Sequence, residues 1–97
     1  MGGDMIPKIK TRYGDMDVEV TTYKTGGMAV ILNQNGQRYA TLSVNFPEVK
    51  LEEDEFAVKT WSENEEIAAD CLASGLFVDT GKRIQSGYVE ASVWRFK

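Results

Sequence analysis

The sequence contains no histidine and only one cysteine among its 97 residues. Histidine is the side chain best suited to proton transfer near neutral pH, so its absence excludes Ser-His-Asp and Cys-His catalytic sites and every histidine-ligated metal site. The single cysteine, Cys71, excludes a disulfide within the chain and a zinc site built from cysteines, and it fits a reducing compartment. We therefore expect a protein that is not an enzyme, with no catalytic residues, no metal and no cofactor.

Long apolar runs are also absent. No stretch approaches the ~20 apolar residues that a bilayer span requires, and residues 1–10 lack the apolar core of a signal peptide. We therefore expect a cytoplasmic protein with no membrane partner. The charged fraction of 27% and the apolar fraction of 42% are ordinary for a folded protein. The length predicts one domain over residues 1–97, in which we expect residues 1–7 to be flexible.

Apolar and polar residues alternate along most of the first half of the chain. Alternation with a period of two is typical of half-buried strands, and it predicts strands at residues 8–13, 17–23, 28–34 and 37–46. Asn35-Gly36 lies between the last two strands and predicts a type I′ hairpin turn, which needs positive φ at both central residues. Glycines at 14 and at 26–27 predict the other turns. The pattern indicates an antiparallel meander.

The second half adds strands on either side of one helix. We predict strands at residues 55–61, 76–79, 82–84 and 88–96, with a turn at Thr80-Gly81 between the second and the third. The last of these strands carries apolar residues on both faces. This indicates either a central strand or an edge strand that lies beneath the helix.

Between these strands the apolar spacing changes to that of an amphipathic helix, predicted over residues 63–74 with Cys71 on its buried face. Ser62 and Glu65 have the spacing of a capping box, and Gly75 predicts a left-handed stop. The fold class is therefore α+β. We expect a mostly antiparallel sheet of about five to seven strands, with the helix packed on one face.

The most unusual feature is the distribution of charge. Residues 48–70 contain nine acids and two lysines, a net charge of −7, whereas the rest of the chain has a net charge of +3, which gives −4 in total. Glutamates near the start of the predicted helix are explained in part by the helix dipole. The consecutive acids at 52–55 lack the alternate spacing around a glycine that calcium loops use. The segment is thus either solvated surface or a face for a positively charged partner.

In the second case, carboxylates on a rigid sheet-helix edge would imitate phosphates and dock on the basic surface of a nucleic-acid-binding protein. Trp61 is out of register with its neighbouring apolar residues, so it is either core or an exposed interface anchor. The residues that we expect to bind the partner are Glu52, Glu53, Asp54, Glu55, Trp61, Glu63, Glu66 and Asp70.

A second hypothesis belongs to a different class. A basic patch could bind nucleic acid directly, as in an accessory protein of a plasmid or transposon, although the overall acidity argues against it. The residues that would form this patch are Lys8, Lys10, Arg12, Lys82, Arg83 and Arg95.

Four blocks of sequence resemble a known family: "YATLSVNFP" from Tyr39, "FAVKTWSENEEIA" from Phe56, "GLFVDTGKR" from Gly75 and "GYVEASVWR" from Gly87. In their order and spacing they are similar to a small domain-of-unknown-function family (numbered 4313) carried by conjugative transposons, plasmids and phages of gut bacteria. The resemblance covers residues 39–96 and implies no activity and no site residues. It implies an accessory gene of mobile DNA, a setting in which small acidic counter-defence proteins, such as anti-restriction and anti-CRISPR inhibitors, are common.

Overall fold

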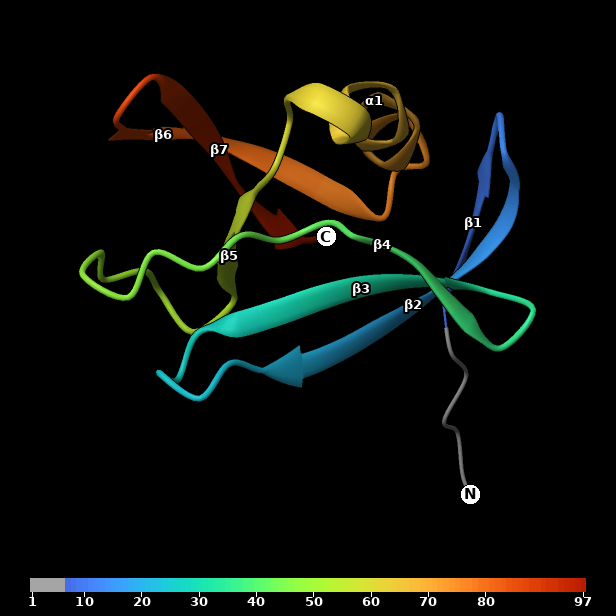
Figure 1. Cartoon of the computed structure of the whole chain (residues 1–97), viewed down its shortest axis with the longest axis horizontal. Coiled ribbons are helices and arrows are strands. Elements are labelled where there is room, and N and C mark those ends of the chain that lie inside the picture. Colours follow the sequence, from blue (N-terminus) through green and yellow to red (C-terminus); the bar gives the residue numbers. More distant parts are fainter. Residues whose placement is uncertain (1–6) are drawn as a thin grey trace.

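The computed structural model describes residues 7–97, so the predicted flexibility of residues 1–7 falls almost wholly outside the described residues. Within this range seven strands and one α-helix follow one another, as Figure 1 shows. The α+β class with mostly antiparallel strands is confirmed. The elements are β1 (Lys8–Thr11), β2 (Gly14–Thr22), β3 (Met28–Gln34), β4 (Gln37–Thr41), β5 (Glu55–Val58), α1 (Glu65–Ala73), β6 (Phe77–Ser86) and β7 (Val89–Phe96).

The first four strands form the predicted meander. Their order in the sheet is β1-β2-β3-β4, and each strand is antiparallel to its neighbour. The turn between β3 and β4 is also the predicted one, since Asn35 has a φ of 54° and Gly36 a φ of 80°. Met16, Val30 and Leu32 are fully buried, so one face of this sheet supplies much of the core.

The remaining strands form a second sheet in the order β5-β7-β6. Strand β7 is the central strand, which resolves the two alternatives predicted from its apolar faces. On one face Phe56 and Trp94 are cross-strand partners that belong to the main core. On the other face Ala57 and Val93 are partners that belong to a second apolar cluster. Both faces of this sheet are therefore covered.

A short segment joins the two sheets. We predicted a strand that runs on to residue 46, but β4 ends at Thr41. The chain after it pairs on both sides: the Leu42 N–H donates to the Val30 carbonyl (2.9 Å), and the Val44 N–H donates to the Ala57 carbonyl (3.0 Å). Alternation continues through this segment because its backbone stays extended, while its hydrogen-bond partners change from β3 to β5.

Strand β6 also differs from the prediction. Residues 76–79 and 82–84 were expected to be two strands, but residues 77–86 form one strand, which begins after Leu76 and whose register shifts between Asp79 and Arg83. The Asp79 carboxylate accepts the Gly81 N–H (2.9 Å), and Gly81 has a φ of 88°. This is turn chemistry placed within a β-bulge, so the same residues that signal a turn produce a local kink instead.

The start of the helix differs from the predicted capping box. Ser62 has a φ of 60° and begins a 3₁₀ turn (Ser62–Asn64), so its hydroxyl does not cap the helix. The helix begins at Glu65, and its N-cap residue, Asn64, makes no side-chain capping bond. Instead Asn64 is buried and donates from Nδ2 to the Thr41 carbonyl (2.8 Å). The predicted stop is confirmed, because Gly75 has a φ of 83°.

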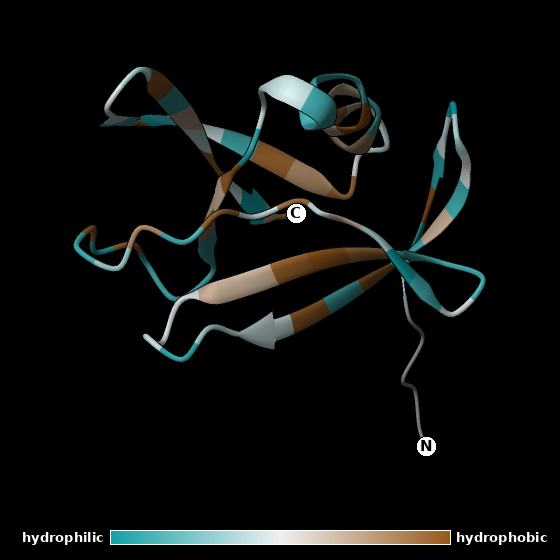
Figure 2. Cartoon of the chain, viewed as in Figure 1, coloured by the Kyte–Doolittle hydropathy of each residue, from teal (hydrophilic) through white to brown (hydrophobic). Residues whose placement is uncertain are grey.

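The main core lies between the two sheets and α1. The helix packs against β1 and β6 and thereby covers the open side between the sheets (Figure 1). Hydrophobic residues lie mainly within the strands and the helix, whereas the hairpin turns are mostly hydrophilic (Figure 2). Cys71 is fully buried in the main core, as predicted, and burial raises the pKa of its thiol to about 12. This places Cys71 among the packing residues and leaves it unreactive at neutral pH.

Candidate partner-binding surface

The eight residues predicted to bind a partner are divided between two places in the structure. One group lies in the loop before β5 and at Glu55, the first residue of β5. The other lies on α1, on the 3₁₀ turn that precedes it, and at Trp61 directly before that turn. We use "44–54 loop" for residues Val44–Asp54. The two groups differ in whether their carboxylates have partners within the protein.

Glu55 is the clearest correction to the predicted site. It is only 7% exposed, and its carboxylate forms an ion pair with Lys82 Nζ (2.8 Å). The same carboxylate accepts the Glu52 N–H (3.0 Å), while the Glu55 N–H donates to the Glu52 carbonyl (3.0 Å). These bonds, led by the one from Lys82, lower the pKa of Glu55. Glu55 therefore closes the turn at residues 52–55 and is not free to bind a partner.

Two carboxylates on α1 are held by one arginine of the β1–β2 hairpin. Arg12 donates from Nη2 to Asp70 (2.9 Å) and from Nη1 to Glu66 (3.1 Å), and its backbone N–H also donates to Asp70 (2.9 Å). The hydroxyl of Tyr13 donates to Glu66 (2.6 Å). The hydrogen bonds from Arg12 hold the pKa of Asp70 at about 2. Glu66 and Asp70 thus join the helix to the first hairpin, and their predicted role in partner binding stays a prediction.

Glu63 is engaged in the same manner. Its carboxylate pairs with the ammonium group of Lys59 four residues earlier, and this bond holds the pKa of Glu63 at about 2. The predicted acidic face of the helix is therefore neutralised in large part by basic residues of the chain itself.

Most residues of the predicted basic patch are likewise paired with opposite charges of the chain itself. Lys8 pairs with Asp17, Arg83 pairs with Asp79, and Arg12 and Lys82 are engaged as described above. Of the six predicted residues, only Lys10 and Arg95 form no ion pair with the described part of the chain. These two lie on different sheets.

Glu52, Glu53 and Asp54 behave differently. All three are exposed, and none forms an ion pair within residues 7–97. Glu48, near the middle of the 44–54 loop, is also exposed and forms no ion pair in this range. Because the turn at residues 52–55 is closed by Glu55, these carboxylates are presented to solvent at defined positions.

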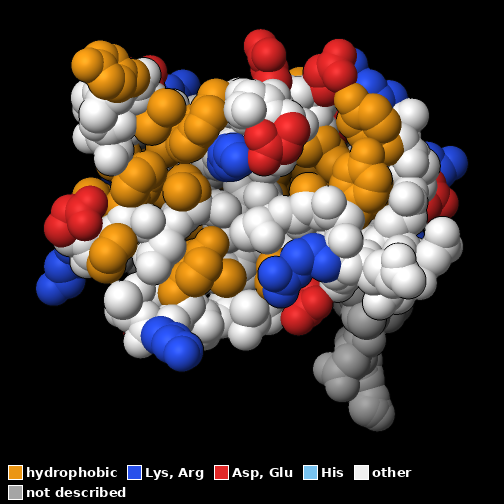
Figure 3. Space-filling model, viewed as in Figure 1, with side chains coloured by type: hydrophobic (Ala, Val, Ile, Leu, Met, Phe, Trp, Pro, Cys, Tyr) orange, Lys and Arg blue, Asp and Glu red, His pale blue; other side chains and the backbone are white. Residues whose placement is uncertain are grey.

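The same loop carries half-exposed apolar side chains. They cover the outer face of the second sheet, where Ala57, Ile84 and Val93 are buried. Figure 3 shows hydrophobic side chains gathered on the side of the β6–β7 hairpin and the 44–54 loop. Trp61, which follows β5, packs against the same apolar cluster. It is half-buried at the margin of the cluster, between the two predicted positions of core residue and exposed anchor. The half-exposed members are Val44, Phe46, Val49, Leu51 and Trp61.

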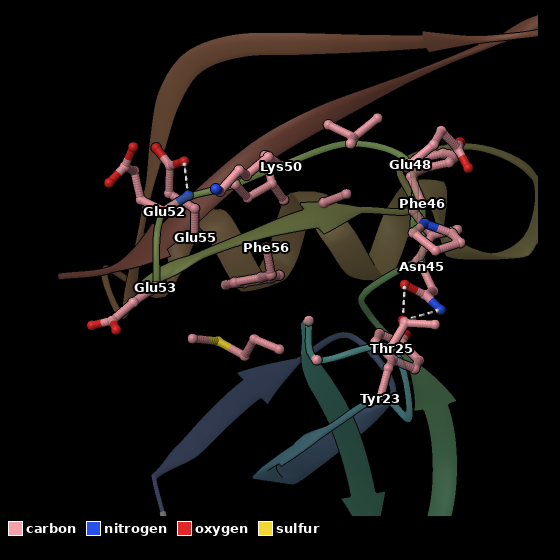
Figure 4. Close-up of a pocket in the computed structure, with 18 residues that line it drawn as sticks. Tyr23, Thr25, Asn45, Phe46, Glu48, Lys50, Glu52, Glu53, Glu55 and Phe56 are labelled. Carbon is pink, nitrogen blue, oxygen red and sulfur yellow. Dashed lines mark hydrogen bonds between the residues drawn. The ribbon is translucent and has the colours of Figure 1, made fainter.

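A groove of about 480 Å³ runs between the 44–54 loop and the turn that joins β2 to β3. Figure 4 shows Glu52, Glu53 and Glu55 at one end of this groove, and Tyr23 and Thr25 at the other. Apolar lining comes from Met28, Phe46 and Phe56 among others. The surface thus combines free carboxylates, half-exposed apolar groups and a depression.

Sequence reasoning missed the apolar half of this surface. The signal was present, because "VNFPEVKLE" from Val44 alternates apolar with polar or charged residues on either side of Pro47. The alternation before Pro47 predicts a longer strand, and the acids after Pro47 predict a solvated loop, so neither pattern alone indicates an apolar surface. The apolar side chains of this loop pack on a sheet, and so the loop has an inner and an outer side.

The residues described give no support for a metal centre or a membrane span. No group of three or more potential ligands comes together within residues 7–97. No helix in this range is long and apolar enough to cross a membrane.

In comparisons with known proteins, no family model, no curated protein and no solved structure matches the chain. The resemblance described in the sequence analysis therefore stays a prediction, and the functional argument depends on the geometry of the surface.

Proposed function

We propose that this chain is a non-enzymatic binding protein whose 44–54 loop docks on a basic surface of another protein. One observation carries the proposal: the adjacent carboxylates of Glu52, Glu53 and Asp54 form no ion pair within the described chain, whereas those of Glu55, Glu63, Glu66 and Asp70 do. The free carboxylates lie in the same loop as the half-exposed apolar cluster. A surface of this kind offers the two contributions common at protein interfaces, an apolar centre and a charged rim.

The charge of the loop would act mainly on the rate of association. Exposed carboxylates attract a basic surface over about one Debye length, ~8 Å at physiological salt, and this attraction weakens as salt is added. The apolar cluster would then set how long the complex lasts, because desolvated aromatic groups such as Trp61 and Phe46 are typical anchors of interfaces.

The mixed character of the surface favours a protein partner whose basic groups are interspersed with apolar ones. A pure imitation of nucleic acid would need a row of carboxylates, and the α1 carboxylates that could extend the row are engaged by Arg12 and Lys59. Direct binding of nucleic acid, the other hypothesis, has less support, since Lys8, Arg12, Lys82 and Arg83 are paired with acids.

The setting is also part of the proposal. If the resemblance holds, the protein acts in the cytoplasm of a bacterium that carries a mobile element. A nucleic-acid-binding defence protein, of the anti-restriction or anti-CRISPR target type, would present the required basic surface. The charge of the loop and the predicted family context support this partner class together, and neither identifies the partner alone.

The proposal is tested by affinity capture from bacterial host cells with two matched variants. The first removes the free charges of the loop (Glu52→Gln, Glu53→Gln, Asp54→Asn). The second removes three exposed carboxylates elsewhere that form no ion pair in the described chain (Asp15→Asn, Glu65→Gln, Glu90→Gln). Both variants change the net charge by +3. A nuclease treatment of the extract removes capture through nucleic acid.

We expect the parent and the second variant to capture the same protein at low salt, with capture declining at high salt. The loop variant should lose at least about 90% of it, which corresponds to roughly 1.4 kcal/mol. Equal capture by both variants would contradict the proposal. Loss of capture by the parent after nuclease treatment would favour the nucleic-acid hypothesis.

A further inference from the structure

The groove beneath the 44–54 loop has two chemically different ends. At one end Glu52 and Glu53 are exposed, without ion-pair partners in residues 7–97 (Figure 4). At the other end the polar groups already satisfy one another: Asn45 Nδ2 donates to Thr25 Oγ1 (3.1 Å), and the hydroxyls of Tyr23 and Ser43 lie 2.9 Å apart. One carboxylate at this second end, that of Glu48, is exposed and forms no ion pair within residues 7–97 (Figure 4). The Glu52 end therefore holds two unpaired carboxylates against one at the other end.

Between these ends the lining is apolar, with Met28, Phe46 and Val49 half-exposed and Phe56 buried behind them. A complementary occupant needs an apolar stem and a cationic head. Lysine and arginine side chains have this form, since they bury their methylene stems and keep the charge near water. Arginine fits best, because its weakly hydrated guanidinium group can form paired hydrogen bonds to carboxylates.

The charges already present in the groove leave room for a second cation. Glu55 is satisfied by Lys82, so a new head group must use Glu52 and Glu53. Lys50 is the one basic residue among those that line the groove, against four glutamates, and it forms no ion pair within the described chain. The net charge of the lining thus remains negative.

We propose that this groove receives one arginine side chain of the partner, with its stem on Met28 and Phe46 and its guanidinium group on Glu52 and Glu53. The inference depends on the proposed function and deepens it, because it selects which basic surfaces the loop can bind. A partner with only dispersed lysines on a flat surface would lack this contact. A partner with one protruding arginine would have it.

The groove is tested directly with a small probe, N-acetyl-arginine methylamide, added to the ¹⁵N-labelled protein and followed by NMR. The matched control probe is N-acetyl-citrulline methylamide, which has the same shape without the charge. We expect saturable shifts at millimolar arginine probe, concentrated at Met28, Asn45 and residues 50–54. The citrulline probe should bind about tenfold more weakly, because the hydrogen bonds to the carboxylates lose their charge assistance. Shifts that do not saturate, or equal shifts for the two probes, would overturn the inference.

A variant that fills the groove gives an independent test without changing any charge. Gly27 lies outside the left-handed region, and a Cβ there would be 3.9 Å from both Asn45 Oδ1 and Tyr23 Cδ2, which is ordinary contact. Gly27→Leu should therefore place its side chain in the groove and abolish the shifts caused by the arginine probe. Ala69→Leu, on the exposed side of α1, is the control for added bulk and should leave them unchanged. Unchanged probe binding in Gly27→Leu would overturn the inference.

The two proposals can fail separately. If the loop-charge variant loses capture while the arginine probe never binds, the loop docks on a partner but the groove takes no arginine. If the probe binds and the loop-charge variant still captures the same protein, the groove inference stands and the proposed function fails.

Discussion

The carboxylates of α1 and those of the 44–54 loop come from one acidic segment of sequence, yet they do different things. Glu66 and Asp70 hold the helix on the first hairpin through Arg12, a residue more than fifty positions away. The side-chain carboxylates of Glu52, Glu53 and Asp54 form no ion pair within the described chain. A cluster of like charges in sequence is therefore not a cluster of equivalent charges in space. Its functional part is found by identifying which charges the fold already uses.

The largest expected effect on stability comes from substituting Glu55, which lies in the sequence between the loop carboxylates and the helix carboxylates. Glu55→Ala should lower the free energy of unfolding by about 1–3 kcal/mol, because it leaves the Glu52 N–H without its acceptor and Lys82 without its partner. Glu53→Ala, two residues earlier and exposed, should stay within about 0.5 kcal/mol of the parent. Urea denaturation of both variants measures the contrast. Equal losses of unfolding free energy in the two variants would contradict the distinction between carboxylates paired within the fold and carboxylates that are free.

A second effect should appear in the dependence of stability on pH. The folded-state pKa values of Asp70 and Glu63 are about 2, below their ordinary values of 3.8 and 4.5, so the unfolded chain binds more protons in acid. Their stabilisation is fully present above about pH 4.5 and should be lost as the pH falls toward 2.

Arg12→Met should remove the Asp70 part of this dependence and lower the melting temperature at pH 7, because the helix loses its bonds to the hairpin. Lys10→Met, in β1 two residues before Arg12 and without an ion pair in the described residues, is the control and should keep the dependence of the parent. Thermal melts between pH 2 and pH 7 measure both variants. Identical profiles for the two would show that Arg12 does not hold the helix.

The sequence predicted regular elements well where the signal is local. The meander, the Asn35-Gly36 turn and the Gly75 stop depend on period-two alternation and positive φ, and all are present in the structure. The capping-box prediction was wrong because Ser62 adopts a left-handed conformation. The hydrogen bond from Asn64 to the Thr41 carbonyl occurs in the same turn. That contact joins residues 23 positions apart, and no local pattern encodes it.

The candidate site was predicted only in part for a related reason. Net charge along the sequence identified Glu52, Glu53 and Asp54, but pairing across the fold decides which carboxylates are free. Arg12 and Lys82 lie far from the acidic segment in sequence, so their effect became visible only with the topology. The apolar half of the surface, including Phe46, needed the position of the loop on the second sheet.

The smallest expected effect on stability comes from substituting Ser62, which lies between β5 and α1. A capping Ser62 would make Ser62→Ala cost about 1 kcal/mol. With Ser62 at a φ of 60°, Ser62→Gly should instead raise stability by up to about 1 kcal/mol, since glycine adopts this conformation without strain. Chemical denaturation of both variants distinguishes the alternatives. A small loss of stability in Ser62→Gly together with a loss of about 1 kcal/mol in Ser62→Ala would restore the capping role.

The most direct test of the division between the two groups is a comparison of two triple variants at pH 7. One removes the loop charges (Glu52→Gln, Glu53→Gln, Asp54→Asn), and the other removes the helix charges (Glu63→Gln, Glu66→Gln, Asp70→Asn), so that the net charge changes equally. The free energy of unfolding of the loop variant should lie within about 0.5 kcal/mol of the parent, because its carboxylates support no contact in the described fold. The helix variant should be clearly less stable. A loop variant destabilised as much as the helix variant would contradict the claim that the loop carboxylates are free for a partner.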